Sequence, residues 1–290
     1  MPRRTDLSLA LAGLNPEAMG LGDVSGPYRA EDRGRTVRAM IEWAGRAGFR
    51  AVQIDARVPG VRARDLDRSG RRDLAATIRR ADLICSGLDL WIPPEHFSDS
   101  RQADRAAAAT LGAIELAADL AALSSGSIVT SAAPRSGALG VVSLVLPGDA
   151  LEDVVSAIVE KARERQVRIA DHAWPVRTRS EEWDDVIGVG LDPAAILLGN
   201  DDPSSVASRL GSRVFSARLS DLSRAVAGAE VVGGAGVRVA AGSRQGRLDV
   251  LAYLVALTTS GYHRPLIADL RGVADQAEGA DQLLSACGGS

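Results

Sequence analysis

The feature that most restricts how this chain can fold is its regular alternation of short apolar runs with amphipathic segments of helical period. The run at 140–146, GVVSLVL, is nearly all apolar, which is typical of a strand covered on both faces. Strands are predicted at residues 7–12, 51–55, 84–92, 140–146, 167–170, 188–191, 214–219 and 265–270. Helices are predicted at residues 36–47, 73–83, 104–123, 150–165, 202–210, 247–260 and 275–286.

Strict alternation of strands and helices indicates parallel strands, because a parallel pair needs a crossover connection. Eight such units in 290 residues favour an α/β fold of the (β/α)8 TIM-barrel type over an open doubly wound sheet. No linker rich in proline, glycine or serine divides the chain, so one domain is expected over residues 1–290. Nucleotide-binding folds are disfavoured, since no G-x-G-x-x-G follows the first strand and no P-loop is present. The glycine cluster at 233–236 is interpreted as a loop.

Charge and cysteine usage narrow the choice of partners and compartment. A net charge of −3 gives no electrostatic reason to expect nucleic acid or an acidic membrane surface. No apolar run reaches the roughly 20 residues of a membrane-spanning helix. Arg3 and Arg4 precede an apolar run that faintly resembles a signal peptide, but the run is only about seven residues long and predicts a first strand instead. Cys85 and Cys287 show no metal or redox spacing, which favours a reducing, cytoplasmic compartment.

Polar side chains are predicted where the strands of such a barrel end, which is where TIM barrels place their sites. The candidates are Gln53, Asp55, Trp91, Glu95, His96, Asp171, His172, Asp192, Arg218, Asp221, Asp269 and Arg271. Three aspartates, Asp171, Asp192 and Asp269, are expected to converge on one mouth. Clustered carboxylates repel one another, and protonation, arginine pairing or a divalent cation relieves that repulsion.

Five of these side chains, or their neighbours, are candidate substrate contacts: Trp91, His96, His172, Trp174 and Arg271. Each also has an alternative role in packing. His172 could equally hydrogen-bond a loop, and His96 could pack its own loop rather than line a substrate wall. Trp174 could either cover the mouth or pack against the sixth helix. His263 precedes the last strand, at the opposite end of the barrel, and is interpreted as structural.

Five stretches carry a family resemblance, in order along the chain. They are residues 47–54 (AGFRAVQI), 189–193 (VGLDP), 214–221 (VFSARLSD), 242–249 (GSRQGRLD) and 261–270 (GYHRPLIADL). Together they resemble the motifs of the xylose isomerase-like TIM-barrel superfamily of sugar phosphate isomerases and epimerases, which also contains AP endonuclease-type nucleases. The resemblance spans most of the chain, and the last two stretches are the most specific.

The resemblance implies a particular metal centre. Members with isomerase or epimerase activity bind Mn²⁺, Mg²⁺, Co²⁺ or Zn²⁺ through a Glu, an Asp, a His and a Glu on strands 5 to 8, and the two glutamates are also the acid/base pair. These positions fall on Asp171, Asp192, Arg218 and Asp269 in this chain, and the strand-2 glutamate becomes Gln53. Only Asp192 is retained in kind. Arginine has no lone pair to donate and stays positively charged, so the sequence leaves open whether a divalent metal binds.

Two interpretations of the centre follow from the ligand chemistry. In the one that we favour, no metal binds, and Arg218 neutralises Asp171, Asp192 or Asp269 with its guanidinium. In the other, a metal is held by these three aspartates, and His172 or His96 replaces the missing histidine. Relatives with this fold commonly form dimers or tetramers, so a homo-oligomer is also expected from the resemblance.

Three functions are compatible with these residues. The first is an isomerase or epimerase that moves a proton next to the carbonyl of a sugar or keto-sugar, with Asp171 and Asp269 as the acid/base pair and Arg218 as an electrophile. The second is a catalytically inactive barrel that binds a small ligand or a partner protein. The third, an AP endonuclease-type phosphodiesterase, is disfavoured because the chain has three histidines and no basic tract.

Overall fold

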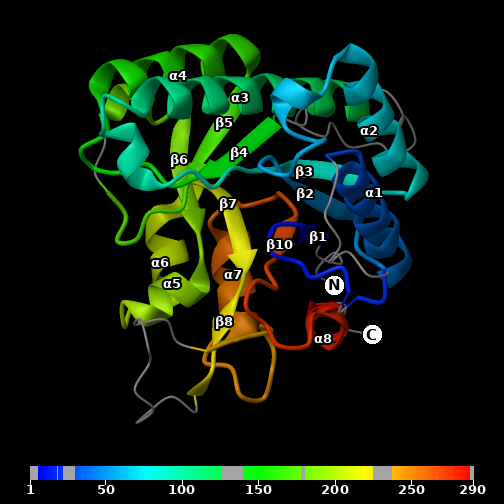
Figure 1. Cartoon of the computed structure of the whole chain (residues 1–290). Helices are drawn as coiled ribbons and strands as arrows, with labels where there is room; N and C mark the ends of the chain where they lie inside the picture. The colour runs from blue at the N-terminus through cyan, green and yellow to red at the C-terminus, as the bar shows by residue number, and fades with distance from the viewer. Residues whose placement is uncertain are drawn as a thin grey trace.

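A closed ring of parallel strands forms the centre of the computed structural model, which describes residues 6–17, 19–21, 30–125, 140–177, 180–224 and 237–287 (Figure 1). Its strands are β1 Leu7–Ala10, β2 Ala51–Asp55, β3 Ile84–Asp89, β4 Gly140–Leu144, β5 Val167–Asp171, β6 Ile187–Leu191, β7 Val214–Leu219 and β10 Leu266–Ala268. Around the barrel they pair in the order β1, β10, β7, β6, β5, β4, β3, β2, and β2 closes the ring on β1. The predicted single-domain TIM barrel is therefore confirmed.

Helices surround the ring on its outside (Figure 1). They are α1 Ala30–Ala47, α2 Arg68–Arg80, α3 Ala103–Ser125, α4 Glu152–Arg165, α5 Pro193–Leu198, α6 Pro203–Leu210, α7 Val250–Thr259 and α8 Gln276–Cys287. Neighbouring helices pack against one another, with α3 on α4 and α6 on α7. Aspartates cap four of the helix starts: Asp67, Asp192, Asp202 and Asp249 each accept a hydrogen bond from a backbone N–H of the first turn.

Three elements differ from the sequence-based expectation. Between β5 and β6 the described residues form a short 3-10 turn, Glu181–Trp183, which is not among the predicted elements. A short helix, α5, follows β6 directly, because Asp192 accepts from the Ala194 N–H and caps it and Pro193 fits the first turn. After β7 comes a small antiparallel pair, β8 Asp221–Leu222 with β9 Arg238–Val239. The glycine cluster at 233–236 lies outside the described residues.

Helix boundaries shift where local hydrogen bonds outweigh the apolar pattern. Helix α2 begins five residues before the predicted 73 because Asp67 caps it, and it ends before the predicted 83 because Asp82 takes a positive φ of 57°. Helix α1 also begins earlier than the predicted 36. The apolar run after Arg3 and Arg4 forms β1, as expected, and its residues are buried.

Helix α3 corrects one sequence-based statement. A 22-residue stretch of it is long and apolar enough to cross a membrane by length and composition, although no stretch of that kind was expected. In the barrel its inner face packs on β4 and α4, and Ile114, Leu116 and Leu120 are fully buried there. Its apolar composition is thus accounted for by burial in the core between helix and sheet.

Leu120→Ala should destabilise the fold by about 2–5 kcal/mol, because it removes buried methyl groups and leaves a cavity. The matched control is Leu251→Ala on α7, where the side chain is 72% exposed, and we expect a change within about 0.5 kcal/mol there. Urea unfolding followed by circular dichroism measures both. Equal effects of the two substitutions would contradict the placement of α3 against the barrel.

Candidate functional site

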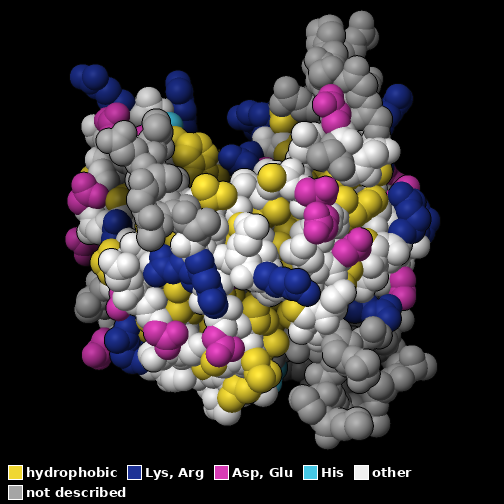
Figure 2. All heavy atoms as spheres, turned by 90° about the horizontal axis from the view of Figure 1, so that it is seen from below, with side chains coloured by type: hydrophobic (Ala, Val, Ile, Leu, Met, Phe, Trp, Pro, Cys, Tyr) yellow, Lys and Arg dark blue, Asp and Glu magenta, His cyan; other side chains and the backbone are white. Residues whose placement is uncertain are grey.

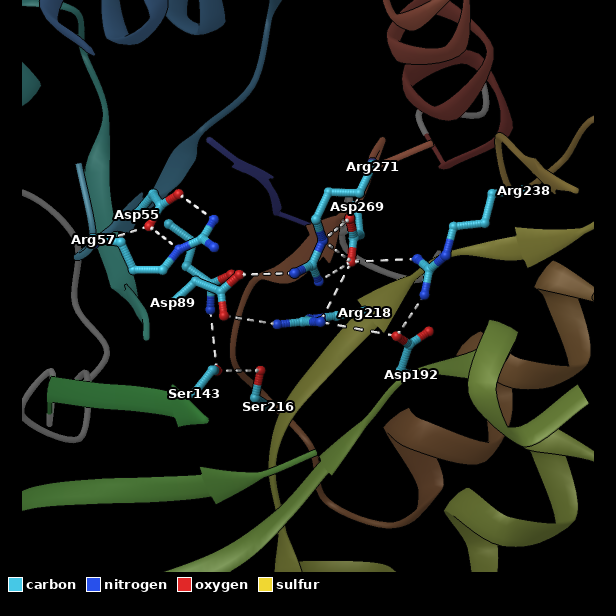
Figure 3. A network of polar contacts seen from close by, with 11 residues as sticks. Asp55, Arg57, Asp89, Ser143, Asp192, Ser216, Arg218, Arg238, Asp269 and Arg271 are labelled. Atoms are coloured by element: carbon cyan, nitrogen blue, oxygen red, sulfur yellow. Dashed lines mark hydrogen bonds and ion pairs between the residues drawn. The ribbon is translucent and has the colours of Figure 1, made fainter. Parts of the chain in front are cut away.

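The carboxyl-terminal end of the barrel, its mouth, holds a dense group of ion pairs (Figure 3). We call the participating residues the Arg–Asp network: Asp55, Arg57, Asp89, Asp192, Arg218, Arg238, Asp269 and Arg271. They come from β2, β3, β7, β9 and the residues just after β2, β6 and β10. The network contains as many guanidinium groups as carboxylates, so its formal charge is zero.

Arg218 lies at the centre of this network and is nearly inaccessible to solvent. Its Nη2 donates to Asp89 Oδ1 at 3.1 Å. Its Nη1 lies 3.4 Å from Asp269 Oδ2 and 3.8 Å from Asp192 Oδ2. Leaving any one of these charges unpaired would be strongly destabilising in so buried a place. One guanidinium therefore holds together the ends of β3, β6, β7 and β10.

Two further arginines, Arg271 and Arg238, neutralise the same carboxylates from the outer side of the mouth. Arg271 binds Asp269 through Nε and Nη2, at 2.9 and 2.5 Å from its two oxygens, and places Nη1 3.2 Å from Asp89 Oδ2. Arg238, on β9, donates from Nη2 to Asp192 Oδ2 at 3.1 Å. The β8–β9 pair therefore contributes a side chain to the mouth, which the sequence did not predict.

The carboxylate of Asp192 has both a structural and an electrostatic role. Oδ1 accepts from the Ala194 N–H at 3.1 Å and from the Ser220 hydroxyl at 2.5 Å, so it caps α5, while Oδ2 faces Arg238. Burial opposes its ionisation, but the charges of Arg238 and Arg218 and the Ser220 hydrogen bond outweigh burial and lower its pKa to about 2. Asp192 is therefore ionised at neutral pH.

Asp269 and Arg271 form a similar charged pair. Burial acts to raise the pKa of Asp269, yet the hydrogen bond from Arg271 and the charge of Arg218 hold it below its ordinary value. Burial likewise disfavours the charged form of Arg271, and the bond to Asp269 raises its pKa nonetheless. An aspartate held ionised in this way is a weak base, which bears on its suitability for proton transfer.

At the edge of the mouth, Arg57 donates from Nε and Nη2 to the two oxygens of Asp55, at 2.9 and 2.8 Å. Its guanidinium carbon lies 5.7 Å from the ring centroid of Trp91, within the range of a cation–π contact. Trp91 is exposed and follows β3. This candidate substrate contact therefore stands at the rim, next to the network.

The predicted convergence of three aspartates holds for Asp192 and Asp269, and Asp89 is the third member in place of Asp171. Asp171 Oδ1 accepts from the backbone N–H groups of Leu146 and Ala173, at 3.1 and 3.0 Å. Its side chain lines a small pocket with residues of β5, β6 and the following loop. Side chains alternate along a strand, so Asp171 and His172 leave β5 on opposite sides.

His172 faces the network. Its ring lies against Gly190 on β6, where a Cβ atom would stand only 2.3 Å away, so a glycine is needed there. The side chain is buried, and neither Nδ1 nor Nε2 has a hydrogen-bond partner in the part of the chain that the structure describes. Burial, together with the charges of Arg218 and Arg271, holds the pKa of His172 well below 6.5, against the opposing charge of Asp269. The imidazole is therefore neutral at physiological pH.

A second polar layer lies below the network inside the barrel (Figure 3). Gln53 donates from Nε2 to the Ser143 hydroxyl at 3.1 Å, and Ser143 is 3.5 Å from the Ser216 hydroxyl. Gln53 is fully buried, and its Oε1 has no hydrogen-bond partner among the residues described. Gln53 stands where the resemblance has a glutamate, so the layer is uncharged.

The remaining candidates lie apart from the ion pairs. His96 belongs to a 3-10 turn, Pro94–Phe97, and is half-buried. The indole of Trp174 packs onto Gly199 at the end of α5, which is the packing alternative for this residue. Asp221 accepts three backbone hydrogen bonds through Oδ1, from Leu222, Arg247 and Leu248, and so joins β8 to the segment before α7.

Asp89, Arg57 and Arg238 are members of the network that sequence reasoning missed. Asp89 lies within the run predicted as one strand at 84–92, where β3 in fact ends at that residue. A charged residue in an otherwise apolar run was the available signal. Arg57 sits two residues past the end of β2, and Arg238 belongs to a strand of two residues that is too short for any periodicity.

The residues at the mouth do not fit the divalent metal that the resemblance implies. Arg218 takes the place of the histidine ligand and offers no lone pair. The oxygens of Asp192 and Asp269 that face the centre already accept from Arg238 and Arg271. Within the described ranges, no group of three or more His, Cys, Asp or Glu side chains is placed to hold a metal ion.

Comparison with known proteins supports the fold. No family model matches the chain, and no curated protein matches it in sequence. A xylose isomerase domain protein from Planctomyces limnophilus matches with a TM-score of 0.62 and 16% identity, over 98% of this chain and 95% of that one. D-psicose 3-epimerase from Clostridium cellulolyticum H10, solved with D-tagatose, matches with a TM-score of 0.61 and 12% identity, over 97% and 96%.

A xylose isomerase-like TIM barrel protein from Mycobacterium smegmatis, in complex with magnesium, matches with a TM-score of 0.60 and 13% identity, over 98% of this chain and 97% of that one. The predicted resemblance is thus confirmed as a shared fold: the chain has the xylose isomerase-like TIM-barrel fold, which sugar isomerases and epimerases also have. At these low identities the likeness concerns the fold alone.

His172 should make the stability of the protein depend on pH in the weakly acidic range. Its pKa is lowered by folding, so the unfolded chain binds the proton and stability falls as the pH drops below about 6.5. We expect stability to fall between pH 7 and pH 5, a dependence that His172→Gln removes and that His263→Gln, at an exposed position, retains. Urea unfolding at both pH values measures it. Parallel pH dependence in all three proteins would disprove the buried neutral imidazole.

Proposed function

We propose that this protein is a metal-independent barrel that binds a small sugar-like molecule at its mouth. One observation carries the proposal: the guanidinium of Arg218 lies among the carboxylates of Asp89 and Asp269, at the position that the resemblance assigns to a metal-ligating histidine. A fixed positive charge there compensates the carboxylates as a divalent cation would. The metal-assisted chemistry of the resembling enzymes is therefore not part of this proposal.

The donors and acceptors at the mouth suit a polyhydroxylated ligand. Arg238 and Arg271 present N–H groups, His172 presents a neutral ring, and Trp91 stands exposed at the rim. Such directional groups, fixed on strand ends, are what a small-molecule site needs for orientation. The D-psicose 3-epimerase of the same fold was solved with a sugar, D-tagatose, which supports the ligand class.

A second candidate function is proton transfer without a metal, as in an isomerase or epimerase. It is favoured by His172, a neutral base with both ring nitrogens unbonded, within electrostatic reach of the cationic Arg218. In this mechanism His172 would move the proton and Arg218 would stabilise the negative oxygen. Asp171, on the other side of β5, and Asp269, bound by Arg271, are weaker choices for the acid/base pair.

Binding should not depend on divalent ions. We expect that a screen of sugars, polyols, sugar acids and sugar phosphates finds a ligand that raises the melting temperature equally in EDTA and in Mn²⁺. At 100 times its Kd such a ligand adds about 2.7 kcal/mol. Arg218→Gln should abolish the shift, and Arg38→Gln, which removes an exposed ion pair with Asp73, should leave it unchanged. A manganese-induced shift of the wild-type protein that EDTA reverses would refute the proposal.

Arg218→His should not create a manganese site by itself. The new imidazole supplies a lone pair, but Arg238 and Arg271 still occupy the oxygens of Asp192 and Asp269 and still oppose a dication. We expect no manganese-dependent shift in melting temperature for this variant, and a shift only after Arg238 and Arg271 are also replaced by glutamine. Tight manganese binding by the single variant would show that Arg218 alone excludes the metal.

A further inference from the structure

The charged groups of the Arg–Asp network are not equally accessible. Three of the four arginine side chains are partly exposed, at 41% for Arg57, 29% for Arg238 and 26% for Arg271, whereas Arg218 is buried. The carboxylates beneath them are buried: the exposed fraction is 7% for Asp89, 9% for Asp192 and zero for Asp269. A molecule that approaches the mouth therefore meets guanidinium N–H groups first, although the network as a whole is neutral.

Two of the buried N–H groups in the network donate no hydrogen bond to the described residues. Arg218 Nε has no hydrogen-bond partner among the described residues, and Arg238 Nη1, which lies 3.7 Å from Asp269 Oδ2 in an ion pair, makes no hydrogen bond to them either. Each guanidinium has five N–H donors in a plane, a geometry that suits the two oxygens of a carboxylate. A buried donor without a partner costs roughly 1–3 kcal/mol, so donors of this kind indicate that something else completes the site.

His172 supplies a different kind of contact next to these donors. It is about nine-tenths buried, and both ring nitrogens lack hydrogen-bond partners within the described ranges. A neutral imidazole has one donor and one acceptor, which is the complement of a hydroxyl group. The orientation of the ring is fixed by its contact with Gly190. The mouth therefore combines cationic donors on its outer side with one uncharged donor and acceptor deeper in.

From this arrangement we propose that the ligand of the mouth is a hydroxycarboxylate, such as a sugar acid, whose carboxylate binds Arg238 and Arg271 while a hydroxyl group hydrogen-bonds His172. This inference rests on the proposed function and narrows its ligand class. A single negative charge suffices, because the network holds as many carboxylates as guanidiniums and so offers a second negative charge no net attraction. A sugar phosphate is therefore disfavoured.

Isothermal titration of the full-length protein in EDTA tests the ligand class with matched probes. D-gluconate and D-galactonate carry both features. Sorbitol has the hydroxyl groups without the carboxylate, hexanoate has the carboxylate without the hydroxyl groups, and sorbitol 6-phosphate carries a dianion. We expect at least one of the two sugar acids to bind ten-fold or more tightly than each of the other three probes.

Variants separate the two contacts. His172→Leu removes the donor and acceptor, and we expect it to weaken the affinity for the sugar acid ten-fold or more while the affinity for hexanoate stays unchanged. His172→Gln keeps a donor and an acceptor and should recover part of the lost affinity. Arg238→Gln should weaken the sugar acid and hexanoate alike and leave sorbitol unchanged. His263→Leu and Arg38→Gln are the surface controls, and circular dichroism confirms that each variant is folded.

Three results would overturn the inference. Sorbitol binding as tightly as the sugar acids would remove the role of the carboxylate while leaving the proposed function intact. Tighter binding of sorbitol 6-phosphate would assign the arginines to a phosphate. If a folded His172→Leu protein loses affinity equally for hexanoate and for the sugar acid, His172 does not contact a hydroxyl group of the ligand. If no probe binds and the wider screen finds no ligand either, the proposed function fails as well.

Discussion

The mouth of this barrel depends on charge compensation in a place that water hardly reaches. Arg218 is stable there only because Asp89, Asp192 and Asp269 surround it, and Asp192 and Asp269 stay ionised because arginines face them. The same contacts join the ends of strands that are far apart in the sequence. They also use the space and the oxygen atoms that a cation would need. Architecture, electrostatics and ligand preference at this end of the barrel thus follow from one cluster of ion pairs (Figure 3).

Much of the fold could be predicted from the sequence because its signals are local and repeated. Each long strand and helix carries its own periodicity, and eight repeats allow little besides a closed barrel. The elements that were missed, α5 and the β8–β9 pair, have too few residues to show a period. The sequence also contains no basic tract, and on the face shown in Figure 2 the charged side chains are scattered and form no single basic tract.

The site could be predicted only in part, because side-chain direction depends on register. A shift of one residue reverses the side of a strand, and this is why His172, and not Asp171, faces the arginines. Asp192, Arg218, Asp269 and Arg271 were identified from strand ends and from the resemblance. Arg238 could not be, since it reaches Asp192 from a segment whose approach to the mouth depends on Asp221 and its backbone hydrogen bonds. Contacts of this kind are long-range and leave no pattern in the sequence.

The connection between β5 and β6, a short turn where other connections carry a helix, has a consequence for motion. Every other strand of the barrel is followed by an α-helix, whereas here Ile187 and Val189 line a small pocket together with Ala173 and Val176 of the loop after β5. Fewer apolar contacts mean that this flank opens at a lower cost than the rest. Solvent and proteases would therefore reach the wall between β5 and β6 first. The barrel wall can open locally there without disturbing the ion pairs that fix its mouth.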